Sequence, residues 1–228
     1  MGLDGIFSSE RGRRVHCAVN LDTKTDLSLE TIDAALDRAR DRGEIVELYA
    51  HSPGRTVKPE VIEHVLAGAA ERGLAPVTYA DFANGEARAP GLALSFDDSS
   101  VRAWSDTLPL FARYGARVTF FISRYEIFYD EEKALVTGLA AAGHDIEPHS
   151  VNHENAPEYV EKHGLGAYLR DDVWPSIDAL EADGHPVHAF AYPFGARTTE
   201  IDDAIRQRVP VLRSVEFSYS GIVSPCPE

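Results

Sequence analysis

The residues best suited to chemistry lie at or just after the ends of segments that are predicted to be strands. They are Asp97 and Asp98, His149 and His153, His51, and the run Tyr192, Pro193, Phe194 and Gly195. Carboxylates and imidazoles can bind a metal ion or transfer protons, and a Pro-Phe-Gly turn can present backbone amides. These groups could form one site if the fold brings the ends of their segments together.

The acidic pair and the two histidines together suggest a metal site. His149 and His153 are four apart in HSVNH, so on a helical turn both would face the same way. Asp98 would complete a two-histidine, one-carboxylate set. That set suits one divalent metal, with zinc first and cobalt, manganese, nickel or iron as alternatives. Two adjacent carboxylates resist joint ionisation unless a cation is near, so a metal at Asp98 would leave Asp97 free as a base.

Simpler interpretations exist for each motif. The two histidines could be unrelated surface residues, and His51 could be structural. Asp98 or Ser99 could cap a helix over 100–114. The positions of these groups at predicted strand ends, together with the pair of aspartates, favour a site over the simpler interpretations.

The elements that must position the site alternate along the chain. We expect strands at 15–20, 44–50, 75–80, 92–96, 117–123, 144–149, 188–192 and 210–215. We expect helices at 28–43, 58–73, 100–114, 130–142, 156–183 (with interruptions) and 198–208. This alternation predicts an α/β fold with a parallel sheet, closed into one barrel domain over 1–228. In such barrels the chemistry lies at the carboxyl ends of the strands.

Composition excludes several classes of protein. The chain has 228 residues with 22 basic and 37 acidic side chains, and its net charge of −15 argues against general nucleic-acid binding. No apolar run approaches the ~20 residues of a membrane span. The segment MGLDGIFSSERGRR lacks an apolar signal core, so the cytoplasm is the expected location. Two cysteines cannot make a disulfide scaffold, and Cys17 is expected to be a buried, inert thiol.

Three of these motifs resemble those of a known family. LSFDDS (94–99) resembles the first motif of the polysaccharide deacetylases, carbohydrate esterase family 4. HSVNH (149–153) resembles the second motif, and AYPFG (191–195) the third. The resemblance implies a distorted, TIM-like (β/α)7 barrel. It also implies a metal-dependent hydrolase that removes the N-acetyl group from an N-acetylated sugar or glycan precursor.

The resemblance also implies a role for each motif residue. Asp98, His149 and His153 would hold the metal, and Asp97 would be the general base. His51 would be the general acid that protonates the departing amine.

The third motif would bind the substrate. The backbone N–H of Phe194 would bind the oxyanion, with Tyr192 and Pro193 beside it.

The order of the motifs differs from the usual order in the family. LYAHSPG (48–54) and the segment after it resemble the family's ending, yet they precede LSFDD. We therefore expect a circular permutation, in which 1–83 matches the family's C-terminal part and 92–218 its N-terminal part. His51 then takes the place of the histidine in the fifth motif.

Two departures from the family pattern leave alternatives open. Ala191 stands where the third motif usually has an arginine, and the fourth motif has no clear counterpart, although Arg213 lies near its expected place. One alternative is an amide or cyclic-imide hydrolase on the same barrel. Another is a non-catalytic sugar-binding or metal-binding protein. The partner is a small-molecule or glycan substrate in the leading hypothesis, and the sequence leaves the oligomeric state open.

Overall fold

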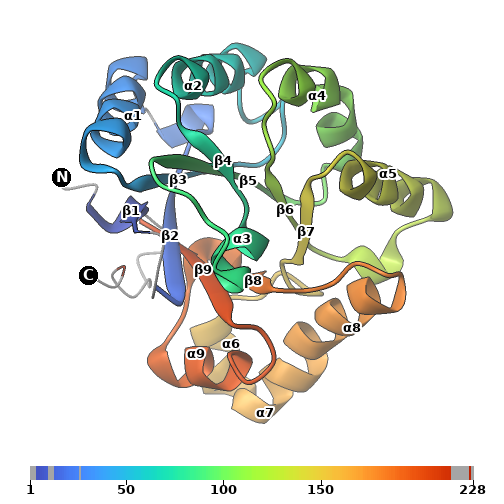
Figure 1. The fold of residues 1–228 in the computed structure, drawn as a ribbon. Helices are drawn as coiled ribbons and strands as arrows, with labels where there is room; N and C mark the ends of the chain where they lie inside the picture. Colours follow the sequence, from blue (N-terminus) through green and yellow to red (C-terminus); the bar gives the residue numbers. More distant parts are fainter. Residues whose placement is uncertain (1–3, 10–12, 26, 217–225, 227–228) are drawn as a thin grey trace.

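The centre of the molecule is a twisted sheet of mostly parallel strands (Figure 1). This computed structural model describes residues 4–9, 13–25, 27–216 and 226. The predicted domain of 1–228 therefore includes positions outside the described residues. Positions 217–218, the end of the segment 92–218 that resembles the family's N-terminal part, are among them.

The strands follow the predicted order and pair in parallel. They are β1 (Phe7–Ser8), β2 (Val15–Asn20), β3 (Ile45–Ala50), β4 (Ala75–Val77), β5 (Gly91–Asp98), β6 (Thr119–Ile122), β7 (Asp145–Pro148), β8 (Ala189–Ala191) and β9 (Val211–Val215). The main path runs β7-β6-β5-β3-β2-β9-β8, with β4 on β5 and β1 antiparallel on β3. Most strands are buried along their whole length, as expected for a parallel sheet covered by helices. Seven strands thus curve into a nearly closed barrel, and the predicted α/β barrel is confirmed.

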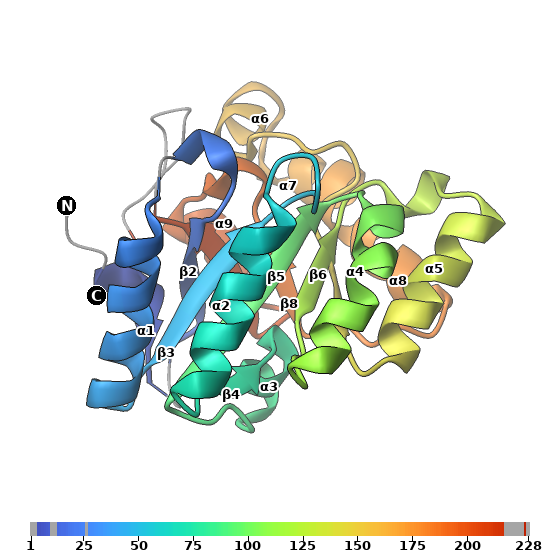
Figure 2. The same cartoon turned by 90° about the horizontal axis from the view of Figure 1, so that it is seen from above.

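Helices cover the outside of the sheet (Figure 2). They are α1 (Leu29–Arg42), α2 (Pro59–Glu71), α4 (Val101–Arg113), α5 (Asp130–Ala141), α6 (Ala156–His163), α7 (Leu165–Tyr168), α8 (Trp174–Ala182) and α9 (Thr199–Ile205). In α1, the Ser28 hydroxyl caps the helix by accepting from the Thr31 N–H, and Gly43 ends it with a φ of 64°. Such caps leave only the apolar stripe of each helix to pack on the strands.

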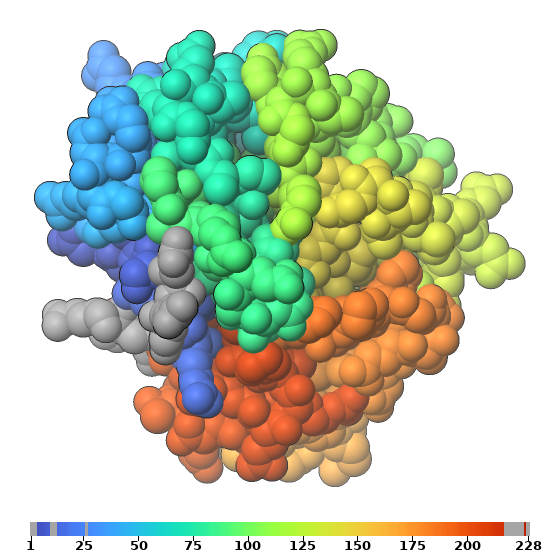
Figure 3. Space-filling model, in the orientation of Figure 1, coloured from blue at the N-terminus to red at the C-terminus, as the bar shows by residue number. Residues whose placement is uncertain are grey.

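A short helix closes the amino end of the barrel, where a longer strand was expected. The prediction of a strand over 75–80 is wrong beyond Val77, because Thr78 and Asp81 form a capping box that starts α3 (Tyr79–Asn84). The Tyr79 N–H donates to the Thr119 hydroxyl at the start of β6. Figure 3 shows this part of the chain filling the centre of that face. The opposite end, where the strands finish, is left for the pocket.

Side chains bridge the seam between β7 and β8, the two ends of the strand path. The Glu147 carboxylate accepts from the backbone N–H groups of His188 and Ala189, at 3.0 and 2.9 Å. At the other end of the seam, His149 Nδ1 donates to the Ala191 carbonyl at 2.9 Å. The barrel is therefore completed here by side chains.

A disulfide joins Cys17 on β2 to Cys226, with their Cα atoms 5.9 Å apart. The expectation that Cys17 is an inert thiol is therefore wrong. The two cysteines are 209 residues apart, but β9 lies beside β2 and leads the chain back toward Cys17. Among the described residues, no helix is long and apolar enough to cross a membrane.

Candidate active site

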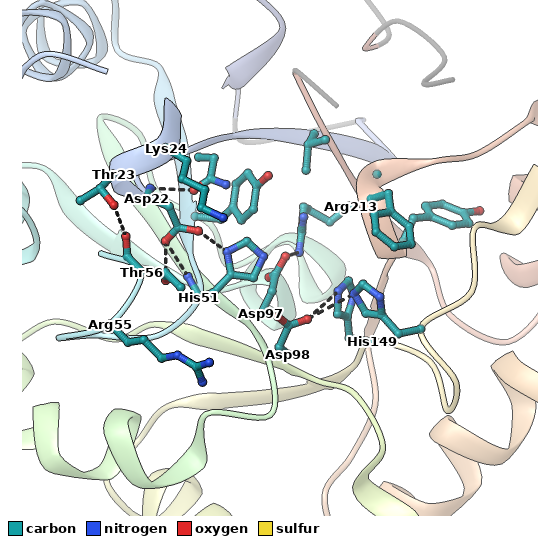
Figure 4. Close-up of a pocket in the computed structure, with 17 residues that line it drawn as sticks. Asp22, Thr23, Lys24, His51, Arg55, Thr56, Asp97, Asp98, His149 and Arg213 are labelled. Atoms are coloured by element: carbon teal, nitrogen blue, oxygen red, sulfur yellow. Dashed lines mark hydrogen bonds and ion pairs between the residues drawn. The ribbon is translucent and has the colours of Figure 1, made fainter. Parts of the chain in front are cut away.

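A pocket of about 540 Å³ opens at the carboxyl ends of the strands (Figure 4). Of the residues singled out in the sequence, Asp97, Asp98, His51, His149, His153, Tyr192, Phe194 and Gly195 line it. Pro193 is buried and is not part of the lining. Four segments that are separate in the sequence thus meet at one pocket, as expected for the ends of parallel strands.

The three predicted metal ligands converge. Asp98 Oδ1 lies 3.2 Å from His153 Nε2 and 3.9 Å from His149 Nε2. A metal ion bound about 2.0–2.2 Å from each ligand atom requires those atoms to be roughly 3–4 Å apart. His149 donates its Nδ1–H to the Ala191 carbonyl, so its Nε2 lone pair faces Asp98. The donor set and its spacing fit one divalent cation.

Electrostatics favours the ligand forms of two of these groups. Burial lowers the pKa of His149 to about 4, although the Asp97 charge opposes this, and the imidazole stays neutral. Burial raises the pKa of Asp98, but the hydrogen bond with His153 and the surrounding histidines outweigh it and lower that pKa. A neutral imidazole beside a carboxylate is what a metal site requires.

An irregular loop, and not a helical turn, brings the two histidines together. The segment after β7 contains Ser150 and His153 in the left-handed region, with φ of 67° and 61°. Buried Asp172 holds this loop from outside the pocket. Its Oδ1 accepts from the Asn152 N–H at 2.6 Å, and its carbonyl accepts from the Val151 N–H at 3.1 Å. The predicted helical turn is therefore wrong, although the two histidine rings do lie close together, with their centres 5.1 Å apart.

Asp98 ends β5 in an uncommon backbone conformation. Its φ is 82°, and its carbonyl accepts from the Ser123 N–H at 2.9 Å. The N-cap of α4 is Ser100, without a side-chain capping bond. Neither Asp98 nor Ser99 is that N-cap, so the capping alternative for the acidic pair fails.

Asp97 is buried against a cation. Its Oδ2 accepts from Nη2 of Arg213, a fully buried residue of β9. The guanidinium carbon of Arg213 also lies 4.9 Å from the ring centre of Tyr49 and 5.0 Å from that of Phe121. The other oxygen, Asp97 Oδ1, is buried without a hydrogen-bond partner among the described residues. Arg213 thus fixes the orientation of Asp97 through one oxygen and leaves the other oxygen without a partner among the described residues.

His51 is oriented by Asp22, two residues after the end of β2. The ring Nδ1 lies 2.5 Å from Asp22 Oδ2, and the Thr56 hydroxyl donates to Asp22 Oδ1 at 2.8 Å. Trp104 of α4 donates its indole N–H to the His51 carbonyl at 2.7 Å. Burial lowers the pKa of His51, but the hydrogen bond to Asp22 and the charge of Asp97 outweigh it and raise that pKa to about 9.

Two features of the site were not predicted from the sequence. They are the pairing of Asp22 with His51 and the ion pair of Arg213 with Asp97. Asp22 follows the strand of residues 15–20 closely, so the same strand-end rule could have found it. Arg213 was noted in the region of the missing motif, but its pairing with Asp97 spans 116 positions, and no local pattern shows it.

The third motif forms a tight turn at the pocket rim. Phe194 is 48% exposed, has a φ of 58°, and packs its ring 4.7 Å from the His153 ring. Gly195 has a φ of 66°, and a Cβ there would lie 2.7 Å from the Val215 backbone nitrogen, so only glycine fits. The Tyr192 hydroxyl donates to buried Asp202 at 2.8 Å and is thereby committed to the protein interior.

A comparison of the sequence with protein-family models identifies the family. A family model described as polysaccharide deacetylase matches residues 84–208, more than half of the chain. The chain belongs to the polysaccharide deacetylase family. The matched region holds Asp97, Asp98 and both histidines of the predicted metal site. His51 lies outside it.

Solved structures share the fold. A polysaccharide deacetylase from Bacillus cereus is 16% identical with a TM-score of 0.61, and the match covers 75% of this chain and 57% of that one, less than two thirds of its length. A de-N-acetylase from Aggregatibacter actinomycetemcomitans is 17% identical with a TM-score of 0.55, and coverage is 74% and 83%. IcaB from Ammonifex degensii is 15% identical with a TM-score of 0.52, and coverage is 94% and 88%. A comparison with curated protein sequences finds no match.

Proposed function

We propose that this deacetylase-family chain is a metal-dependent hydrolase that removes the N-acetyl group from an N-acetylated sugar or glycan precursor. One observation carries the proposal. A three-residue ligand set, a carboxylate outside that set and a carboxylate-paired histidine line the same pocket. Pure binding would need neither the spare carboxylate nor the paired histidine.

Asp98, His149 and His153 would hold the cation, and zinc suits their oxygen and nitrogen atoms. Cobalt, manganese, nickel or iron are the alternatives. When bound, such a cation polarises an amide carbonyl and lowers the pKa of a nearby water molecule.

Asp97 would act as the general base. Its Oδ1 has no partner among the described residues, while Arg213 donates to Oδ2 and holds the carboxylate in place. Arg213 would do from β9 what the arginine missing at Ala191 does in the usual third motif.

His51 would act as the general acid. A pKa of about 9 keeps its imidazole protonated at neutral pH, ready to give a proton to the departing amine. Asp22 fixes the ring orientation through Nδ1, so that the other ring nitrogen is the one available to the amine.

Phe194 would bind the oxyanion through its backbone N–H, from the rim of the pocket. Tyr192 lines the pocket beside it, while Pro193 acts only by shaping the turn.

Metal content and acetate release test the proposal together. The purified protein should contain about one divalent ion, and His153→Ala should contain none; His163→Ala, an exposed histidine on α6, is the matched control. Asp97→Asn should keep the metal and lose turnover of N-acetylated sugars. A metal-free parent after reconstitution would contradict the proposal. Metal binding without acetate release from any N-acetylated sugar would favour an imide hydrolase or a binding protein.

We also propose a cellular location that differs from the cytoplasm expected from the sequence. The disulfide of Cys17 with Cys226 favours an oxidising compartment over the reducing cytoplasm that the sequence predicts. Trapping free thiols in protein taken from its native source tests this. Recovery of both cysteines as free thiols would restore the cytoplasmic prediction.

A further inference from the structure

The acidic side chains of the pocket are all engaged by other groups. Among the described lining residues these acids are Asp22, Asp97 and Asp98. Asp22 is bonded to His51 and Thr56, Asp97 to Arg213, and Asp98 lies in the ligand set. None of these three acids is bonded to Arg55 in the part of the chain that the structure describes.

Two further cations, Lys24 and Arg55, line the same pocket. Figure 4 shows both on the side where His51 lies, with His149 on the other side. Arg55 is exposed, and its side chain forms no hydrogen bond or ion pair with the part of the chain that the structure describes. A guanidinium left without a carboxylate is notable in a chain with a net charge of −15.

The backbone of Arg55 is held firmly beside His51. The Arg55 and Thr56 N–H groups donate to the Ser52 carbonyl at 3.1 and 2.9 Å. The Thr23 N–H donates to the Thr56 carbonyl at 2.9 Å, which joins this loop to the turn that carries Lys24. Both cations thus rise from one hydrogen-bonded pair of loops at the ends of β2 and β3.

The position of His51 tells which part of a substrate these cations meet. In the proposed reaction His51 protonates the amine, so the sugar that carries the amine lies on the His51 side. The acyl group lies toward Asp98 and the two metal-site histidines. Lys24 and Arg55 therefore face the amino sugar and not the acetyl group.

We propose that Arg55 binds an anionic group, a carboxylate or a phosphate, on the amino-sugar part of the substrate. The inference rests on the proposed function and narrows its substrate class. A guanidinium presents two parallel N–H groups that match a carboxylate or phosphate, and the acidic surface elsewhere repels such a ligand. The pocket is thus selective for an anion that the rest of the molecule would not attract.

A matched series of substrates tests this subsite. The series is N-acetylglucosamine, its 1-phosphate, its 6-phosphate, and the analogue with a carboxylate at carbon 6. We expect kcat/KM for at least one anionic member to exceed that of the neutral sugar by roughly 10- to 100-fold. The carboxylate and phosphate members identify which anion is preferred. Arg55→Gln should remove most of this ratio and Arg55→Lys should keep part of it. Arg42→Gln, an exposed arginine at the end of α1, should keep all of it.

Direct binding separates the two proposals. Calorimetry with the product analogue glucosamine 6-phosphate needs no turnover. If no acetate is released but this binding weakens in Arg55→Gln and not in Arg42→Gln, the reaction fails and the subsite stands. Equal kcat/KM for neutral and anionic substrates, or a ratio unchanged in Arg55→Gln, would overturn the subsite while leaving the deacetylase intact.

Discussion

At the scale of single residues, two ion pairs define the proposed proton-transfer groups. Asp97 pairs with Arg213, and His51 pairs with Asp22. Both pairs are largely shielded from solvent, where charges interact strongly and a lost partner is costly. Each pair therefore leaves a measurable trace in stability as well as in activity.

Removing Arg213 should destabilise the protein through charge. Arg213→Met leaves Asp97 buried without its cation, so the free energy of unfolding of the metal-free protein should fall by about 3–5 kcal/mol. Adding Asp97→Asn should recover much of that loss, as urea denaturation can measure. An equal loss in the double variant would mean that Arg213 stabilises mainly by packing on Tyr49 and Phe121.

The His51 pair predicts a pH dependence. The pKa of His51 is raised from 6.5 to about 9 in the folded protein, so protonated His51 stabilises the fold. This contribution is complete below pH 6.5 and is lost as pH rises through about 9. The free-energy difference between the parent and Asp22→Asn should therefore be larger near neutral pH than at about pH 10. NMR titration of the His51 ring should show a lower pKa in the variant. An unchanged pKa would contradict the role of Asp22, and the His64 ring on α2 serves as the internal control.

At the scale of elements, local signals predicted most of the fold. The strand at 15–20 matches β2, and the helix at 28–43 matches α1 within one residue at each end, because Ser28 and Gly43 are strong caps. The run APVTYA looked like a strand throughout, yet the capping box of Thr78 with Asp81 prevailed after Val77. The loop of the second motif could not be predicted, because its shape depends on Asp172, distant in sequence.

That loop gives a prediction about metal affinity. Asp172→Ala removes the acceptor for the Asn152 N–H, so the loop that carries His153 loses its support. Metal affinity should fall by about 10- to 100-fold. Asp172→Asn keeps an acceptor oxygen and should retain most of the affinity. Asp171→Ala, at the neighbouring residue that pairs with Arg170, is the control. Calorimetric titration with zinc measures all three, and equal affinity in Asp172→Ala and the control would count against the positioning role.

At the scale of the whole molecule, contacts between residues far apart in the chain could not be predicted from the sequence. The single barrel follows from alternation, but the disulfide joins residues 209 apart, and neither cysteine has a neighbour that signals the other. The first and last long strands, β2 and β9, pair in register from Val15 with Leu212 to Ala18 with Val215. The first and last long strands of the described chain are therefore neighbours in one continuous part of the sheet. This is the geometry that a circular permutation needs, and the permutation stays a prediction.

The disulfide should contribute measurably to stability. It closes a loop of most of the chain, so its loss raises the entropy of the unfolded state. Cys226→Ser should lower the free energy of unfolding by about 2–4 kcal/mol in denaturant under oxidising conditions. Under reducing conditions parent and variant should agree. A difference that persists after reduction would show that the serine itself, and not the lost crosslink, is responsible.

The seam between β7 and β8 has a mechanical consequence. His149 bonds to β8 through Nδ1, and its other ring nitrogen faces the proposed cation. The same imidazole therefore closes the seam and serves as a proposed ligand. A bound cation would restrain that ring and thereby strengthen the closure of the barrel. Release of the cation would let the seam open more often. Amide hydrogen exchange in β8 should then become faster when the cation is removed. The backbone of β8 would thus report whether the cation site is occupied, although β8 contributes no ligand to that site.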